Sequence, residues 1–113
     1  MAITVLTQFD FHHVLAEKAG PSLVYFTAPG CGACRQLKQV LKENAQRLNG
    51  INLFEVDAQQ EMALTREFEV FHLPSMFLFL DGHYHAPIHA EPRPQSLLDA
   101  IEAALASPPM EAP

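Results

Sequence analysis

Tryptophan is absent from the sequence, and cysteine occurs only twice. Two cysteines cannot form the disulfide network that stabilises small secreted proteins, so this class of protein is excluded. The longest apolar run, Met76–Leu80, falls far short of the roughly 18 residues that a membrane-spanning helix requires. No lysine or arginine precedes Lys18 and no long apolar stretch lies near the N-terminus, so the sequence predicts no signal peptide. We therefore expect a cytoplasmic protein.

Positive charge is also scarce. The 7 Lys and Arg residues are outnumbered by 13 Asp and Glu residues, which gives a net charge of −6 with histidine neutral. No basic run is present, and this argues against nucleic acid or an anionic membrane as a partner. The length of 113 residues fits one domain and not two. Nothing in the composition indicates an oligomer, so a monomer is the default expectation.

Strand and helix patterns alternate along the chain. Strands are expected at residues 3–6, 22–27, 51–56, 76–80 and 83–89, where β-branched and aromatic residues gather. Helices are expected at residues 8–19, 60–68 and 94–106, and a longer one runs from after Pro29–Gly30 to Asn49–Gly50. Asp81–Gly82, a dipeptide typical of tight hairpin turns, makes the last two strands antiparallel.

This order of elements predicts the fold class. Strands that alternate with helices indicate an α/β fold, with a central mixed sheet of about five strands and helices on both faces. Residues 1–106 are expected to form the domain, and residues 107–113 a disordered C-terminal tail. On the helix at 60–68, the expected buried residues are Met62, Leu64 and Phe68.

The two cysteines, Cys31 and Cys34, lie between the strand at 22–27 and the long helix. Residues three apart on a helix are about 5–6 Å apart, which suits the Cα separation of a disulfide. At the start of the helix, Cys31 faces unpaired backbone N–H groups and the positive end of the helix dipole, which favour its thiolate. Cys34 lies one turn further, on the side of Leu37, so it should be more buried. An exposed nucleophile with a buried resolving cysteine is the arrangement that thiol–disulfide exchange requires.

Other roles for the cysteine pair remain open at this point. The two side chains can be small buried apolar groups without chemistry. A structural zinc site needs four ligands, and no histidine close in sequence supplies the missing two. Arg35 occupies the position after the second cysteine, where covalent haem attachment requires a histidine. A dimer that carries a metal or a cluster between the cysteines of both chains is a further alternative.

From about Ile3 to Leu105, the sequence resembles the thioredoxin family. The segments that carry the resemblance are VYFTAPGCGAC, LFEVD, HLPSMFLFLDGH and the final helix. The resemblance implies a thioredoxin-like fold and a thiol–disulfide oxidoreductase with no metal and no other cofactor. Cys31 would be the nucleophile and Cys34 the resolving cysteine. The partners would be a disulfide-containing protein substrate and, as electron donor, a reductase or a small thiol.

The resemblance also implies a substrate-binding surface beside the cysteines. Pro74 would follow a cis peptide bond, and Leu73 would offer its backbone N–H and C=O to an extended peptide. A trans proline that only marks the entry to a strand is the alternative. The other residues expected to contact substrate are Gly30, Gly32, Ala33, His72 and Ala90.

The sequence departs from the thioredoxin pattern around the motif. Gly30 replaces the tryptophan before the first cysteine, and Ala33 replaces a proline. Tyr25 stands where a buried acid helps to deprotonate the second cysteine, and Leu53 stands where that acid has a lysine partner. Ala90 replaces a glycine. These changes favour a narrower or different partner, and the alternative is a thioredoxin-fold binding or regulatory module with little turnover.

Glu55 and His72 are candidates to replace the missing proton-handling pair. Glu55 lies on a strand close to the motif, although a solvated position near a strand end is the simpler interpretation. An imidazolium at His72 would stabilise a thiolate at Cys31, although a surface histidine without a chemical role is again simpler. Without a buried acid, the resolving step should depend more steeply on pH.

Three further histidines, His83, His85 and His89, alternate along the last expected strand. Side chains two residues apart on a strand point to the same face, so the three should share one face of the hairpin. An exposed strand face is the favoured interpretation, and a metal site or an acid-sensitive cluster is the alternative.

Overall fold

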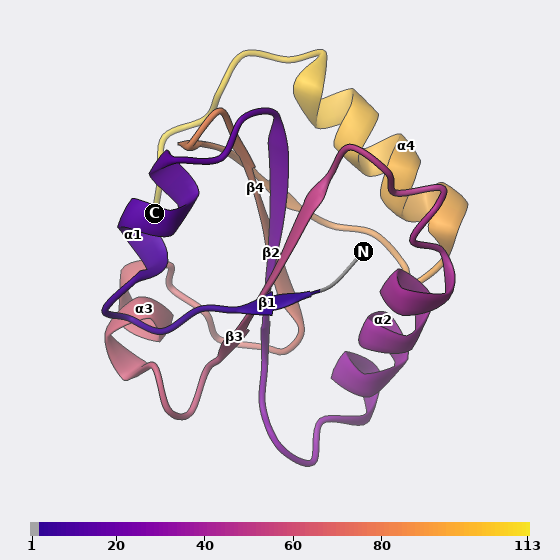
Figure 1. Cartoon of the computed structure of the whole chain (residues 1–113). Coiled ribbons are helices and arrows are strands. Elements are labelled where there is room, and N and C mark those ends of the chain that lie inside the picture. Colours follow the sequence, from indigo (N-terminus) through magenta and orange to yellow (C-terminus); the bar gives the residue numbers. More distant parts are fainter. Residues whose placement is uncertain (1–2) are drawn as a thin grey trace.

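The structure is a computed structural model that describes residues 3–113. In chain order its elements are β1 (Thr4–Val5), α1 (Phe11–Ala16), β2 (Pro21–Thr27), α2 (Gly32–Glu43), β3 (Asn52–Asp57), α3 (Met62–Glu67), β4 (Ser75–Leu80), β5 (His83–Ile88) and α4 (Pro94–Leu105). Figure 1 shows α1 and α3 on one side of the sheet and α2 and α4 on the other. The predicted order of elements and the predicted α/β fold class are confirmed. Within residues 3–113, no helix is long and apolar enough to cross a membrane.

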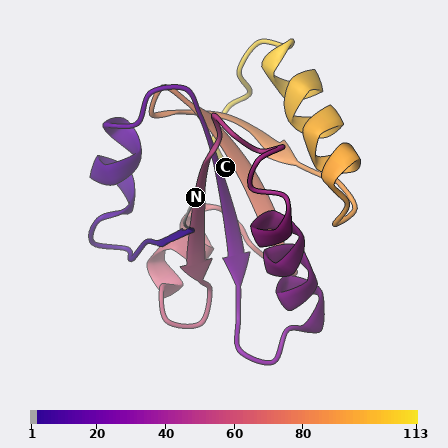
Figure 2. The ribbon, with the colours of Figure 1, turned by 45° about the vertical axis from the view of Figure 1, so that its right-hand side comes forward.

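The sheet is mixed and has the spatial order β1-β3-β2-β4-β5. β1 and β2 both pair with β3 in parallel, whereas β4 is antiparallel to β2 and β5 is antiparallel to β4. β2 is the central strand, and its residues 22–26 are buried. Both of its faces are covered by helices, which explains its nearly continuous apolar sequence. Figure 2 shows that β2 ends at a loop that leads directly into α2.

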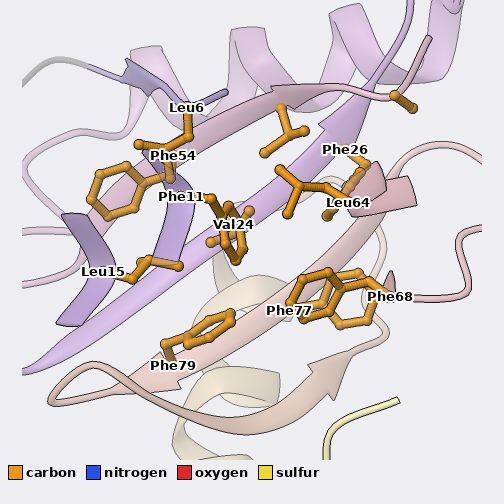
Figure 3. Packing of buried hydrophobic residues seen from close by; sticks show 12 residues of the cluster. Leu6, Phe11, Leu15, Val24, Phe26, Phe54, Leu64, Phe68, Phe77 and Phe79 are labelled. Atoms are coloured by element: carbon orange, nitrogen blue, oxygen red, sulfur yellow. The ribbon is translucent and has the colours of Figure 1, made fainter. Parts of the chain in front are cut away.

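Phenylalanine dominates the core between the sheet and the α1/α3 layer (Figure 3). The ring of Phe68 lies at its centre, 5.3 Å from both Phe11 and Phe77 and 6.0 Å from Phe26, measured between ring centroids. These rings are tilted rather than stacked face to face, and such pairs add about 0.5–1.5 kcal/mol each to the gain from burial. The cluster ties α3 to the sheet just before the chain turns toward Pro74.

The opposite core lies between the sheet and the α2/α4 layer. Leu37 and Leu41 of α2 pack with Leu97 and Ile101 of α4 over the central strand. The spacing of four residues in each pair places both side chains on one face of its helix. Burial of this stripe fixes the start of α2 against the end of β2.

Three of the helices are shorter than the sequence predicts. α2 ends at Glu43, because the backbone N–H and the side-chain Nδ2 of Asn44 both donate to the carbonyl oxygen of Val40, at 3.1 and 2.8 Å. The backbone bond is the regular helical bond between residues four apart, whereas the side-chain bond caps the helix, and residues 44–50 form turns. α1 begins only at Phe11, because Asp10 accepts hydrogen bonds from the backbone and side chain of Thr7 in a preceding turn.

α3 is also shorter and buries fewer residues than predicted. Leu64 and Phe68 are buried as expected, but Met62 is 46% exposed. Residues four apart lie on one face of a helix, so Leu64 and Phe68 point together into the core. Met62 precedes Leu64 by two residues and therefore points away from that face.

The predicted hairpin is present, but its histidines do not share a face. Asp81 and Gly82 have φ of 51° and 83°, which suits the tight turn that the sequence predicts. The register of β4 against β5 shifts between Leu78 and Phe79, which indicates a β-bulge near His85. His85 is consequently buried, and its Nε2 lies 2.6 Å from the carbonyl oxygen of Ala104. The predicted common exposed face of His83, His85 and His89 is therefore wrong.

Residues 107–113 follow α4 without helix or strand. The N–H of Met110 donates to the carbonyl oxygen of His85 at 2.7 Å. The domain boundary after residue 106 and the disorder of this segment stay predictions.

The aromatic core makes a prediction about stability. Because Phe68 is buried among several rings, Phe68→Ala should lower the free energy of unfolding by about 3–5 kcal/mol through lost burial and a residual cavity. Phe9, which is 85% exposed, provides the matched control. Phe9→Ala should change the same quantity by less than about 0.5 kcal/mol. Urea unfolding followed by circular dichroism measures both, and equal effects would contradict the packing.

Candidate active site

Cys31 and Cys34 form a disulfide at the start of α2, with their Cα atoms 5.3 Å apart. Cys31 is the N-cap residue of the helix, and its Sγ accepts a hydrogen bond from the backbone N–H of Cys34 at 3.2 Å. Cys34 is 2% exposed, whereas Cys31 is only partly buried. The first sulfur is therefore the accessible one. In the reduced pair, the same amides and the helix dipole stabilise a thiolate at Cys31.

A tight turn connects β2 to this helix. The backbone N–H of Cys31 donates to the carbonyl oxygen of Ala28 at 3.2 Å, and the N–H of Arg35 donates to that of Cys31, also at 3.2 Å. Gly30, which lies between Ala28 and Cys31, has a φ of 82°, a left-handed conformation that other residues adopt only with strain. No atom beyond its chain neighbours lies within 4 Å of a Cβ built on Gly30, so strain rather than space disfavours a tryptophan here.

A surface hollow of about 360 Å³, here called the Pro74 hollow, begins at Ala33 between the cysteines. The Leu73–Pro74 peptide bond in its wall is cis, as the resemblance implies. Predicted substrate residues that line it are Ala33, His72, Leu73, Pro74 and Ala90. Two predicted residues, Gly30 and Gly32, do not line it and are exposed beside Cys31.

His72 lies at the edge of the hollow with an exposed side chain. Its carbonyl oxygen accepts a hydrogen bond from the Ser75 hydroxyl at 2.7 Å, which fixes the backbone just before β4. Its role toward the Cys31 thiolate stays a prediction.

Beneath α2, the side chains of Tyr25, Glu55 and Lys38 form a polar cluster. It lies where the family pattern has the buried acid that this sequence lacks. Tyr25 and Glu55 are registered partners on β2 and β3, and the Tyr25 hydroxyl donates to Glu55 Oε1 at 2.5 Å. The Nζ of Lys38 lies 3.1 Å from the same oxygen. The Glu55 side chain is only 15% exposed, so it is not simply solvated. Lys38 follows Cys34 by one helical turn, which places both on the same side of α2.

Burial, followed by the hydrogen bond and the charge of Glu55, raises the pKa of Tyr25 well above its ordinary value. Tyr25 is therefore a neutral hydroxyl that donates to a carboxylate. Leu53, at the position of the missing lysine, is buried in the apolar core under α2. Sequence reasoning identified Glu55 but missed Lys38, whose only signal was its spacing of four residues from Cys34.

Within residues 3–113, no three histidine, cysteine, aspartate or glutamate side chains are arranged to hold a metal ion. The polar groups of the site consist of the sulfurs, the helix amides and the Tyr25–Glu55–Lys38 cluster.

An α/β domain with a Cys-x-x-Cys disulfide at a helix start and a cis proline beside it defines a redox-type site. The family model described as Thioredoxin matches residues 2–103 of the chain. A thioredoxin from Staphylococcus saprophyticus is 32% identical over 83 residues, which cover 73% of this chain and 78% of the relative. The chain therefore belongs to the thioredoxin family, and the resemblance stated from the sequence is confirmed.

Other relatives are longer proteins. Protein disulfide isomerase-like 1-3 from Arabidopsis thaliana is 32% identical over 90 residues, or 79% of this chain, but only 15% of that protein is covered. Protein disulfide-isomerase erp38 from Neurospora crassa is 34% identical over 91 residues, or 77% of this chain, and 24% of that protein is covered. The zinc-bound form of human ERp44 superposes with a TM-score of 0.78 at 21% identity, covering 90% of this chain and 31% of that one. This structural likeness confirms the thioredoxin-like fold.

The Tyr25 hydroxyl makes a prediction about alkaline pH. In the unfolded chain Tyr25 ionises near the ordinary tyrosine pKa of about 10, whereas in the folded chain it keeps its proton. Its stabilisation is therefore complete below about pH 10 and is lost as pH rises further. Tyr25→Phe should lower the free energy of unfolding by about 1.5–3 kcal/mol at neutral pH. The difference in free energy of unfolding between the variant and the unsubstituted chain should then decrease by up to about 1.4 kcal/mol per pH unit above pH 10.

Urea unfolding of both proteins between pH 7 and pH 11 measures this difference. The Glu55→Gln background is the control, because it removes the charged acceptor but keeps the tyrosine. A difference in free energy of unfolding that stays constant from pH 7 to pH 11 would contradict the raised pKa of Tyr25.

Proposed function

We propose that this chain is a thiol–disulfide oxidoreductase that reduces or exchanges disulfides of partner proteins. The observation that carries the proposal is the Cys31–Cys34 pair, one sulfur accessible and the other buried, at a helix start. Membership of the thioredoxin family supports the same activity, since thioredoxin-type proteins act on disulfide-containing substrates with a reductant. The specific partner and the direction of exchange belong to the proposal.

The reaction needs only the two cysteines and the substrate. In the reduced protein, the Cys31 thiolate attacks one sulfur of the substrate disulfide, and the other substrate sulfur leaves as a thiolate. Cys34, once deprotonated, then attacks the Cys31 sulfur of the mixed disulfide and releases the second substrate thiolate. The substrate has gained two electrons and, with two protons, becomes a dithiol. The protein is left with the Cys31–Cys34 disulfide, the state that the structure contains.

Substrate binding is assigned to the Pro74 hollow and its surroundings. An extended substrate segment would pair with the backbone N–H and C=O of Leu73. Gly30 and Gly32 carry no side chain, so a substrate backbone can approach Cys31 closely. The remaining contacts are assigned to Ala33, His72, Pro74 and Ala90, which line the hollow.

A return of two electrons to the disulfide completes the cycle. We assign this step to a reductase or a small thiol, and we place the chain in a reducing compartment such as the cytoplasm. The scarcity of cysteine supports the placement, because proteins of oxidising compartments commonly use disulfide networks. No metal or organic cofactor takes part in the steps above.

The cysteines make the first functional prediction. Cys31→Ser should lower disulfide reduction at least about 1,000-fold, because a hydroxyl at neutral pH is far less nucleophilic than a thiolate. Cys34→Ser should keep the first attack and accumulate a mixed disulfide, since nothing resolves it. An insulin-type reduction assay measures turnover, and non-reducing electrophoresis with mass spectrometry identifies trapped partners from cell extract. Absence of both turnover and trapping would instead support the binding-module alternative.

Glu55 makes the second functional prediction. If its carboxylate accepts the proton of Cys34, directly or through water, Glu55→Gln should slow release of the mixed disulfide about ten-fold near pH 7, within the range of general-base effects. The difference from the unsubstituted chain should shrink as pH rises, because hydroxide then competes as the base. Glu43→Gln is the control, because Glu43 lies at the exposed end of the same helix and bonds Gln39. Identical pH profiles for both variants would remove Glu55 from the mechanism.

A further inference from the structure

The steps above give no role to Lys38, the cation of the polar cluster under α2. Its Nζ lies 3.1 Å from Glu55 Oε1, and the same oxygen accepts the hydrogen bond from the Tyr25 hydroxyl. Both contacts are to Oε1, so the second carboxylate oxygen of Glu55 can take up a proton. A cation is therefore joined to the carboxylate that is expected to accept the proton of Cys34.

This ion pair lies beneath the helical turn that begins at Cys34. Lys38 follows Cys34 by four residues, and side chains with this spacing are neighbours on a helix, with Cβ atoms about 5–6 Å apart. Helical side chains also lean toward the N-terminus of their helix, so the stem of Lys38 runs back toward Cys34. Tyr25, which holds Glu55 from β2, packs in the same buried cluster as Leu37 of this turn. Glu55 is therefore held under the turn that carries the buried sulfur.

The partial burial of Glu55 makes its charge depend on this cation. The Glu55 side chain is only 15% exposed, whereas that of Lys38 is 41% exposed. Burial disfavours an ionised carboxylate, and a positive charge within about 4–6 Å favours it. The Tyr25 hydroxyl donates a hydrogen bond but carries no charge. A partly exposed ion pair contributes little to stability, so the effect of Lys38 is expected on protonation of Glu55 rather than on folding.

The other groups around Glu55 do not take the place of Lys38. On β1, the residue registered with Glu55 is Val5, which does not titrate. On β3, Asp57 lies two residues further along the same face, and its Oδ1 accepts hydrogen bonds from two backbone N–H groups of the following turn. On α2, Lys42 is exposed one turn beyond Lys38. Within residues 3–113, Lys38 alone has a cationic nitrogen within 4.0 Å of the Glu55 carboxylate.

We propose that Lys38 is a positioning residue of the resolving step and that, through Glu55, it sets the lowest pH at which the mixed disulfide is released efficiently. As the Cys34 sulfur attacks Cys31, its proton passes to the Glu55 carboxylate, directly or through water. The Cys31–Cys34 bond forms, the bond from Cys31 to the substrate sulfur breaks, and its electron pair leaves with the substrate thiolate. The charge of Lys38 keeps the carboxylate ionised, and so able to accept this proton, at lower pH.

This inference rests on the proposed oxidoreductase function and adds a residue and a pH range to it.

The test measures formation and decay of the mixed disulfide separately. Reduced protein is mixed rapidly with a peptide disulfide between pH 4 and pH 9, in enough excess that formation is faster than decay. Samples are quenched with acid, and mass spectrometry quantifies the mixed disulfide.

The variants differ in the charge at one position. Lys38→Met removes the charge but keeps an apolar stem, and Lys38→Gln removes it with a polar side chain, which serves if Lys38→Met does not fold. Lys38→Arg keeps the charge. Lys42→Met is the matched control, because it removes a charge from an exposed position of the same helix. Each variant is also made in the Glu55→Gln background.

We expect Lys38→Met and Lys38→Gln to move the acidic limb of the decay rate to higher pH by about one unit, the lower end of the effect of a neighbouring cation on a carboxylate. On this limb, decay at a given pH should be about ten-fold slower than in the unsubstituted chain. The difference should disappear at higher pH, where the carboxylate is ionised in every variant. Lys38→Arg and Lys42→Met should keep the original profile. The formation rate should change less than about two-fold, because Lys38 lies two helical turns from Cys31.

The Glu55→Gln background separates an effect through Glu55 from a direct effect on the sulfur. Without the carboxylate, Lys38→Met should leave the decay profile unchanged. A shift of the same size in this background would overturn the inference, because Lys38 would then act on Cys34 itself. An equal shift with Lys42→Met would also overturn it, since any positive charge on the helix would have the same effect.

The outcomes distinguish this inference from the function on which it rests. A mixed disulfide that forms but decays with the same pH profile in the unsubstituted chain, Lys38→Met and Lys38→Gln would overturn only the role of Lys38. A decay rate without an acidic limb would have the same consequence. If the unsubstituted chain forms no mixed disulfide at any pH, the proposed function itself is wrong.

Discussion

The site depends on the attachment of the amino end of α2 to the carboxyl end of β2. Burial of Leu37 and Leu41 under the central sheet sets the rotation of the helix, and this rotation determines which cysteine faces the core. Cys34 shares the buried side with these leucines, so Cys31 is left at the helix start, where free backbone amides favour a thiolate. A helix rotated by one residue would expose the resolving sulfur and lose this division of roles.

The polar cluster under α2 shows how the protein keeps a negative charge near the site without a buried acid on β2. The carboxylate comes from Glu55 on the neighbouring strand, and it has both a hydroxyl donor and a cation as partners. An unpaired carboxylate in the core would be costly, whereas this one is near the surface and hydrogen-bonded. These partners compensate for its partial burial, and the apolar core accepts Leu53 where the family pattern has a lysine.

Local sequence was sufficient to predict the strands, the hairpin turn and the redox motif, because each depends on neighbouring residues. Contacts between distant parts of the chain explain two of the errors. The burial of His85 depends on a bulge opposite β4 and on the carbonyl oxygen of Ala104 in α4, which no periodicity reveals. Lys38 was missed because its partner Glu55 lies on another element. The early end of α2 at Glu43 depends on a side-chain cap at Asn44, which competes with a leucine pattern that continues further.

The absence of tryptophan and the exposure of Phe71 bear on the same problem of partner recognition. Gly30 leaves little apolar surface on the Cys31 side of the site, and its left-handed backbone disfavours a large residue there. Apolar surface is instead concentrated beyond Pro74, beside the edge of β5. An open strand edge next to an exposed aromatic side chain invites unspecific pairing. The bond from the N–H of Met110 to the carbonyl oxygen of His85 occupies one position of this edge, which limits such pairing there.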